Sequence, residues 1–271
     1  MFAFIGLYYD EPKEVRIGPR AGEIEPLAPG FEAGDPLREL KVRKALNLAI
    51  NRDAIQQAYY SGGGVIPEGM WAIAPYMPEF KDDWQPYPYS PDEAKQLLAE
   101  AGYPDGFTFD LHVAKMSGTP EAPEIAEVLA ADWKAVGLDP QIKDQDFGNI
   151  LGRVRDRDLQ GVWVVRYSMG HFAIAACFPM SNVAGGCGSS QWEIEELDDI
   201  YIYMKEAVAA EDLLQRTREM ADWVYENYLV VPLFYIFPQV LIDPKVVAEY
   251  QANHLHYGPV RHHEYTKAVY K

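Results

Sequence analysis

Four histidines near the C-terminal end are the densest group of side chains that could bind a metal. They are His254, His256, His262 and His263, and neutral imidazole is a common ligand of transition metals. No cysteine and no fixed pattern of carboxylates accompanies them, so a solvated tail explains them more simply. We expect no bound metal and no cofactor, and we rank a metal-dependent hydrolase as the last hypothesis.

Other patterns that could support catalysis are incomplete. The sequence has no Gly-x-Ser-x-Gly elbow for a serine nucleophile. Gly62-Gly63-Gly64 follows a predicted helix, and no Gly-Lys-Ser/Thr comes after it to complete a phosphate-binding loop. The acidic run that contains Glu193, Glu195 and Glu196 falls at the start of a predicted helix, where the helix dipole favours negative charge. The sequence therefore predicts a protein that is not an enzyme.

The two cysteines have two interpretations. Cys177 and Cys187 lie in a Gly- and Ser-rich stretch and carry no local nucleophile signature. In an oxidising compartment they could form a disulfide that orders the short loop between them, worth about 2–3 kcal/mol. Otherwise they are two unpaired thiols.

The composition limits the partners of the chain. Its 271 residues are 48% apolar, which is enough for a sizeable core, and its net charge of −17 repels phosphate backbones. The protein is therefore not expected to bind nucleic acid. No run of about 18 apolar residues is present, and Met1–Tyr9 lacks the basic flank of a signal peptide. Either the chain is cytoplasmic, or a leader and more has been removed.

The elements that would position a site are clearest in residues 89–113. Ser90 is placed to cap a helix that begins at Pro91, and Gly102 suits its C-terminal end. After a turn, alternating apolar residues from Phe107 to Val113 predict a strand. Further strands are predicted at 1–9, 138–143, 159–168 and 230–242, and further helices at 36–50, 52–60, 120–136, 147–155, 194–209 and 212–228. Because strands alternate with helices, the fold class is α/β with a mostly parallel sheet.

Four stretches, in order, resemble one protein family. The run Leu40–Arg52 is similar to the "vRqAlnlAiDr" helix of extracellular solute-binding proteins (family 5) that serve peptide, dipeptide and nickel ABC importers. Tyr89–Phe107 resembles the "yDpekAkeLLaeAGyp-Gf" unit of that family, Gly161–Trp163 its "gW" strand, and Val231–Phe234 its "iPLy" strand.

The resemblance implies a periplasmic-binding-protein-like (type II) lobe, with only the C-terminal half of the family's length. It implies an entering strand and linker at 1–36, a second solute-binding lobe at 37–239, and a returning segment at 240–271. The expected partners are a peptide or other small polar solute, the membrane subunits of an ABC transporter, and a missing N-terminal lobe. The location implied is periplasmic or extracellular.

The expected ligand contacts lie after two strands, because ligands bind beyond the carboxyl ends of strands in open α/β sheets. The residues are Met116, Ser117, Trp163, Arg166, Tyr167, Ser168 and His171. In the family an aspartate that receives a peptide's amino group is common where this chain has Arg166. A guanidinium there would bind a carboxylate, or else pair with an acidic neighbour. Trp163 would either stack on the ligand or pack in the core.

The leading hypothesis is reversible closure of two lobes on a solute, without chemistry. Since only one lobe is expected here, the chain alone should bind peptides weakly or not at all. An exposed strand at Phe2–Tyr9 is expected to offer an open sheet edge for a homodimer. The alternative is a scaffold or interaction module built from such a lobe, with no solute.

Overall fold

A five-stranded mixed sheet forms the centre of the protein. The computed structural model describes residues 1–31, 33–61, 73, 77–116, 119–166, 181–185, 191–235, 243, 245–249 and 267–268. The order of strands in the sheet is β5-β4-β6-β1-β7. Their bounds are β1 Phe2–Gly6, β4 Thr108–Val113, β5 Asp139–Asp144, β6 Gly161–Val165 and β7 Val230–Pro232. The predicted α/β class with a mostly parallel sheet is confirmed, since β5, β4 and β6 are parallel and only β1 runs against its neighbours.

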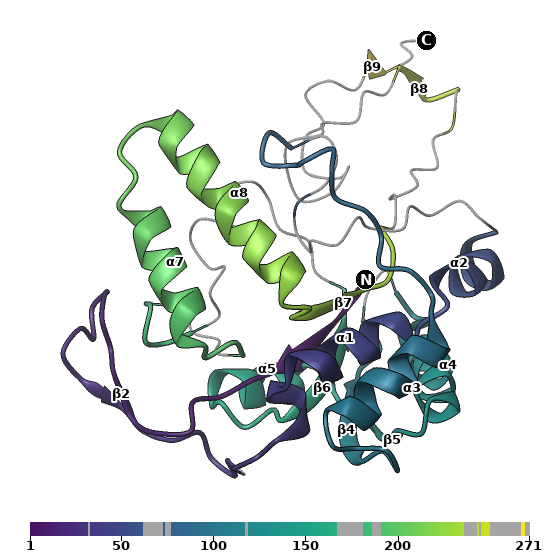
Figure 1. The fold of residues 1–271 in the computed structure, drawn as a ribbon. Coiled ribbons are helices and arrows are strands. Elements are labelled where there is room, and N and C mark those ends of the chain that lie inside the picture. Colours follow the sequence, from purple (N-terminus) through teal and green to yellow (C-terminus); the bar gives the residue numbers. More distant parts are fainter. Residues whose placement is uncertain are drawn as a thin grey trace.

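Helices cover the sheet and extend from it (Figure 1). A 3-10 helix, η1, spans Pro36–Arg38, and the α-helices are α1 Leu40–Leu48, α2 Arg52–Tyr60, α3 Pro91–Glu100, α4 Ala122–Ala135, α5 Phe147–Arg155, α7 Glu195–Lys205 and α8 Ala210–Glu226. Two small sheets pair β2 (Lys13–Glu14) with β3 (Ile24–Glu25) and β8 (Val247–Glu249) with β9 (Lys267–Ala268). The α7–α8 pair forms a hairpin that projects on one side, whereas α1, α3 and α4 gather on the other (Figure 1).

Aromatic side chains fill the core on both faces of the sheet. On one face, the ring of Phe109 in β4 lies 5.5 Å from that of Trp133 in α4, and Trp133 donates through Nε1 to the carbonyl oxygen of Leu46. On the other, Phe4 of β1 lies 5.7 Å from Trp192 and 6.1 Å from Trp163. All of these rings are buried, so the sheet is covered on both sides.

The α3–β4 unit matches its prediction except at one cap. α3 begins at Pro91, and Gly102 adopts φ +94°, the left-handed conformation that suits a helix end. Ala94 and Leu98 are buried as their spacing predicts. Ser90 makes no side-chain capping hydrogen bond, so that detail is wrong. The helix start instead relies on Pro91 and on the acidic residues of its first turn.

Two other element predictions need correction. The helix expected to begin near Pro36 is divided, because Glu39 is extended (φ −75°, ψ 124°) between η1 and α1. The strand expected at 230–242 stops at Pro232, while its residues 236–242 lie outside the described part. Asn51, in contrast, caps α2 as predicted, since its side chain accepts from the backbone N–H of Ala54.

The strand at the N-terminus does not form an open edge, so that expectation is wrong. Phe2 of β1 pairs with Val165 on one side and with Pro232 on the other. Two rows of backbone partners therefore enclose β1, and every residue from Phe2 to Gly6 is buried. The edges of this sheet are β5 and β7. A homodimer built on Phe2–Tyr9 would first have to remove β7.

The connection between β1 and η1 is tied down by a buried ionic network. Arg157 donates to both oxygens of Glu193, with Nε–Oε1 2.5 Å and Nη2–Oε2 2.7 Å, and through Nη1 to Glu25 Oε1 at 2.9 Å. All three side chains are buried. Because Glu25 belongs to β3, the network holds the β2–β3 hairpin against the body of the protein.

Candidate functional site

One edge of the sheet gathers the ends of several chain segments. Strands β4 and β6 are parallel and end at Val113 and Val165. Because β1 runs the other way, its first residue, Phe2, lies opposite Val165 at this same edge. β7 ends here too, since Pro232 is the other partner of Phe2. We call this the carboxyl edge, and it is where an open α/β sheet places a ligand.

Arg166 lies at the carboxyl edge, directly after β6, and is exposed. The backbone amine of Met1 lies close by and donates to the carbonyl oxygen of Phe234 at 2.5 Å. Burial lowers the pKa of this amine to about 4, the positive charge of Arg166 lowers it further, and the negative charge of Glu121 opposes that shift. Arg166 and Glu121 are therefore both close enough to the start of β1 to act on the same group.

Glu121 comes from the segment that leads into α4. It is half-buried, and its Oε1 accepts a hydrogen bond from the hydroxyl of Tyr60, the last residue of α2. The Tyr60 ring lies 4.6 Å from the ring of Phe234. Burial, and then the hydrogen bond to Glu121, raise the pKa of Tyr60, so this hydroxyl stays protonated and donates.

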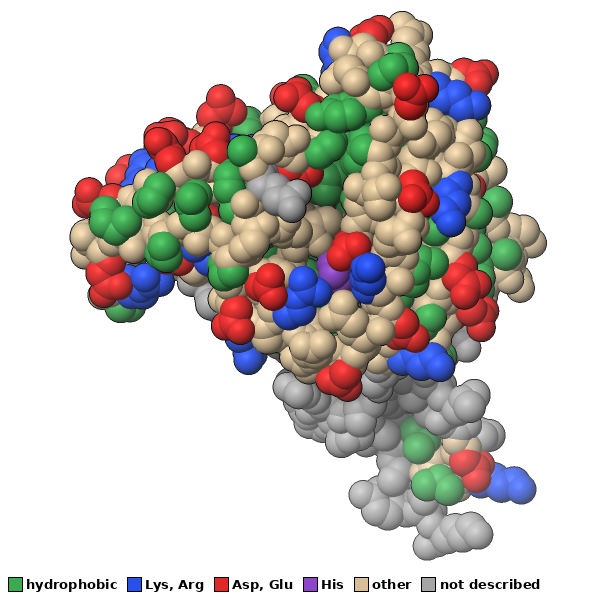
Figure 2. Space-filling view, turned by 90° about the horizontal axis from the view of Figure 1, so that it is seen from below, with side chains coloured by type: hydrophobic (Ala, Val, Ile, Leu, Met, Phe, Trp, Pro, Cys, Tyr) green, Lys and Arg blue, Asp and Glu red, His purple; other side chains and the backbone are tan. Residues whose placement is uncertain are grey.

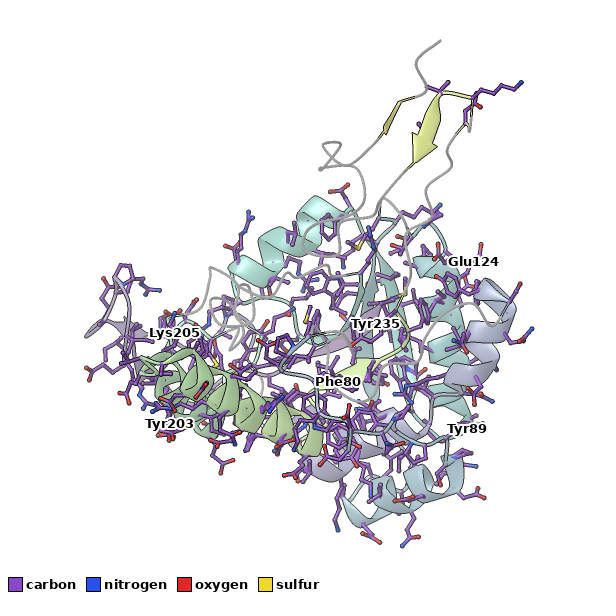
Figure 3. The ribbon with its side chains drawn as sticks, turned by 90° about the horizontal axis from the view of Figure 1, so that it is seen from above. Phe80, Tyr89, Glu124, Tyr203, Lys205 and Tyr235 are labelled. Atoms are coloured by element: carbon purple, nitrogen blue, oxygen red, sulfur yellow. The ribbon has the colours of Figure 1, made fainter. Side chains whose placement is uncertain are left out.

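A second aromatic pair lies beside the first. The rings of Phe2 and Tyr235 meet edge to face with centroids 6.1 Å apart, and the Tyr235 hydroxyl donates to the carbonyl oxygen of Ile73 at 2.8 Å. Figure 3, which looks down from above, shows Tyr235 in the middle of this view and Glu124 of α4 toward its outer side. Among the described residues, Arg166, Glu121 and these two aromatic pairs thus all lie near the carboxyl edge.

The residues predicted from sequence have different placements. Arg166 lies at the carboxyl edge, and Met116 is half-buried beyond the end of β4, where it forms a bridge with Thr119. Trp163 is only 3% exposed and packs against Phe4, so it lies in the core. Its Nε1 is buried without a hydrogen-bond partner. Ser117, Tyr167, Ser168 and His171 lie outside the described residues, as do both cysteines and the four C-terminal histidines.

Sequence reasoning missed Glu121 and Tyr60. Tyr60 ends a helix more than sixty positions before the loop that contains Glu121, and no local pattern links the two. One signal was available: Glu121 is the second residue of the helix predicted at 120–136, directly after the loop that pointed to Met116.

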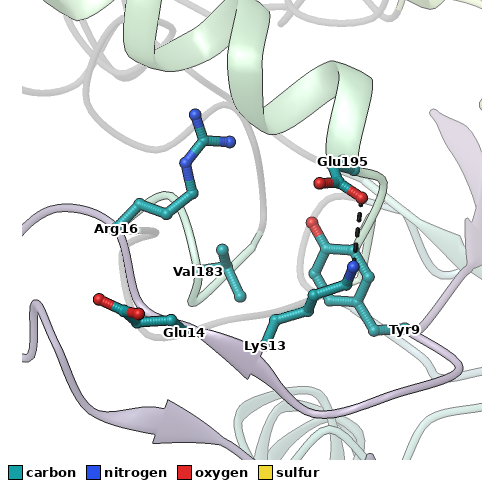
Figure 4. A pocket seen from close by; sticks show the side chains of 6 residues that line it. All are labelled: Tyr9, Lys13, Glu14, Arg16, Val183 and Glu195. Atoms are coloured by element: carbon teal, nitrogen blue, oxygen red, sulfur yellow. Dashed lines mark hydrogen bonds and ion pairs between the residues drawn. The ribbon is translucent and has the colours of Figure 1, made fainter.

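A cavity among the described residues lies at the opposite edge of the sheet, and Figure 4 shows the side chains that line it. It measures about 330 Å³ and is lined by Tyr9, Lys13, Glu14, Arg16, Val183 and Glu195. Lys13 forms an ion pair with Glu195 at 3.2 Å, and Arg16 forms one with Asp199 at 2.5 Å. These pairs join the β2 segment to the first turn of α7, so the cavity belongs to a structural junction.

One further face of the molecule, seen from below, carries charged side chains of both signs among apolar and other side chains (Figure 2). Within the ranges given above, no three His, Cys, Asp or Glu side chains come together as a metal site would require. Those ranges also contain no helix of sufficient length and hydrophobicity to span a membrane.

Solved structures share this fold at low sequence identity. A dipeptide-binding protein from Pseudoalteromonas sp. SM9913, in complex with Met-Leu, superposes with a TM-score of 0.62 at 22% identity, over 74% of this chain and 40% of that one. NikA from Brucella suis, in complex with Fe(III)-EDTA, gives 0.61 at 16% identity, over 77% of this chain and 44% of that one. These likenesses confirm the expected type II binding-protein fold.

Sequence comparison gives the family. The dipeptide-binding protein of Escherichia coli K12 is 35% identical over 170 residues, which are 61% of this chain and 31% of that protein. Heme-binding protein A of Haemophilus influenzae is 35% identical over 126 residues, 46% of this chain and 23% of that protein. The chain thus matches less than a third of the length of either relative. The profile of the bacterial extracellular solute-binding proteins, family 5, matches residues 7–171, and the chain belongs to that family.

Proposed function

We propose that the chain is the solute-binding component of an ABC importer and binds a peptide or a similar polar solute. Family membership supports the transport role, and the relatives named for dipeptides support the solute class. The single observation that carries the proposal is the place of Arg166. It follows β6 directly at the carboxyl edge, where an exposed guanidinium can bind a carboxylate through two parallel hydrogen bonds.

Binding would work by closure of two lobes, with residues 37–239 as the body of one lobe. Segments 1–36 and 240–271 would connect it to the other. The described geometry supports this arrangement, because the start of β1 and the residues after β7 meet at the carboxyl edge through the Met1–Phe234 hydrogen bond. A solute that contacts both lobes would shift the hinge toward the closed state, which would dock on the membrane subunits outside the cytoplasmic membrane.

The test compares peptides that differ only at the C-terminus. Trialanine and trialanine amide would be titrated against the chain and followed by ligand-observed NMR, which detects millimolar binding. We expect trialanine to bind more tightly than its amide, and Arg166→Gln to remove this difference. Arg155→Gln on α5 is the control, because Arg155 is equally a surface arginine but lies away from the carboxyl edge. An unchanged preference for trialanine in Arg166→Gln, or an equal change in Arg155→Gln, would contradict the proposal.

A further inference from the structure

Glu121 is a partly buried carboxylate that forms no ion pair within the described part of the chain. Its one hydrogen bond among those residues comes from the Tyr60 hydroxyl. The N-terminal end of α4 lies directly after it and favours its negative charge. Its second oxygen, Oε2, is left to accept from another group.

A short chain of contacts connects Glu121 to Arg166. The Tyr60 ring that orients Glu121 packs on Phe234 at 4.6 Å, and the Phe234 carbonyl accepts from the Met1 amine at 2.5 Å. The next residue, Phe2, is paired with Val165, which precedes Arg166. Glu121 and Arg166 are therefore both connected to the start of β1 by these contacts, and both charges act on the Met1 amine.

We propose that Glu121, oriented by Tyr60, is a specificity-determining residue that binds the ammonium group of a zwitterionic solute whose carboxylate lies at Arg166. This inference rests on the proposed function and adds the orientation of the solute to it. A carboxylate attracts an ammonium group by charge, and the face of an aromatic ring attracts it through the ring quadrupole. Because the residue after β6 is an arginine, the carboxylate that binds the ammonium group of the solute comes from another element, the segment before α4.

The test again uses matched peptides, this time modified at the N-terminus. Trialanine and N-acetyl-trialanine would be titrated against the wild type, Glu121→Gln and Tyr60→Phe by ligand-observed NMR. We expect Glu121→Gln to weaken trialanine about tenfold and to leave N-acetyl-trialanine unchanged. Tyr60→Phe keeps the ring and removes the hydroxyl, so a smaller loss of about threefold is expected. Each variant should first show the wild-type thermal unfolding curve.

Glu124→Gln is the matched control. Glu124 belongs to the same helix turn but is exposed and makes no hydrogen bond to Tyr60 (Figure 3). It should bind both peptides as the wild type does. An equal loss in Glu121→Gln and Glu124→Gln would show general electrostatic attraction by an acidic protein and would overturn the proposal.

A second probe separates this inference from the proposed function. Phenethylammonium carries the ammonium group and a ring but no carboxylate. If it binds, and Glu121→Gln weakens it while trialanine fails to bind, the ammonium site is supported and the peptide function is wrong. If trialanine binds the wild type and Glu121→Gln equally, the function survives and this inference is overturned. Failure of both probes to bind overturns this inference, because it requires an ammonium site on this chain.

Discussion

Arg52 donates through Nε to the carbonyl oxygen of Pro232 at 2.5 Å and so joins the first residue of α2 to the last residue of β7. The guanidinium is buried and also donates to the backbone oxygen of Asn47 at 3.0 Å and to its side-chain Oδ1 at 2.9 Å. Burial lowers its pKa to about 10, so it stays charged at neutral pH. Arg52 belongs to the segment Leu40–Arg52, which resembles the family. Through its bond to Pro232 it fixes the end of β7, and the Met1 amine binds just after that strand, at Phe234.

Arg52→Lys should destabilise the protein by about 2–3 kcal/mol. Lysine keeps the charge, but its single ammonium group cannot donate to the separated oxygens of Pro232 and Asn47 at the same time. Denaturant unfolding followed by circular dichroism measures the loss. Arg155→Lys, at an exposed position on α5, should stay within about 0.5 kcal/mol of the wild type. Equal stability of the two variants would show that the bonds of Arg52 contribute little.

Because of Asp198, the free energy of unfolding should fall as the pH rises from about 4 to 7. Its carboxyl group is buried, Tyr9 and Ser181 donate to Oδ2 at 2.5 and 3.1 Å, and Oδ1 has no partner. Burial raises its pKa to about 7. The folded protein therefore binds this proton more tightly than the unfolded chain, and that contribution is complete below about pH 4 and is lost as the pH passes 7.

Asp198→Asn should remove this dependence, since asparagine still accepts from Tyr9 and carries no charge. The difference in free energy of unfolding between variant and wild type should grow between pH 4 and 7 by about 2–4 kcal/mol and then level off. Asp199→Asn is the control, because Asp199 is exposed in its ion pair with Arg16. A flat difference for Asp198→Asn across this range would refute the assignment.

Gly161→Ala should strongly impair folding. Gly161 has φ +93°, and a Cβ atom there would lie 2.3 Å from the carbonyl oxygen of Asp110 in the neighbouring strand. We expect a loss of at least about 3 kcal/mol from the combined clash and strain. Gly152→Ala in α5 is the matched change, because nothing lies within 4 Å of its Cβ position. It should stabilise the helix by about 0.5–1 kcal/mol. Thermal unfolding of both variants tests the pair.

Arg157→Gln should cost about 3–5 kcal/mol, because it removes the buried cation that Glu193 and Glu25 share and leaves Glu25 with its ion pair to Arg20. The hairpin of β2 and β3 should lose protection first, since Glu25 is its link to Arg157. Hydrogen exchange measured by mass spectrometry would show faster exchange in residues 11–28 than in β4. Uniform loss of protection across the sheet would mean that the network supports the whole core instead.

The sequence alone could predict those helices and strands whose boundaries depend on residues next to them in the chain. Asn51 lies next to the helix that it caps, and the apolar run of β6 shows an interior strand without reference to anything distant. It could not predict that β1 is enclosed, because the partners of Phe2 are Val165 and Pro232, far along the chain. For the same reason, the sequence could not predict the hydrogen bond between Tyr60 and Glu121. The position of Arg166 directly after β6 could be predicted, because it depends only on where that strand ends.

The enclosed position of β1 also decides when this protein can finish folding. The Met1 amine and the Phe234 carbonyl that it contacts are separated by 233 positions. During synthesis, Phe2 and Phe4 are made long before their partners in β7. This apolar strand therefore lacks one of its two neighbours until β7 has been made, and a holding chaperone would protect it from aggregation during that time.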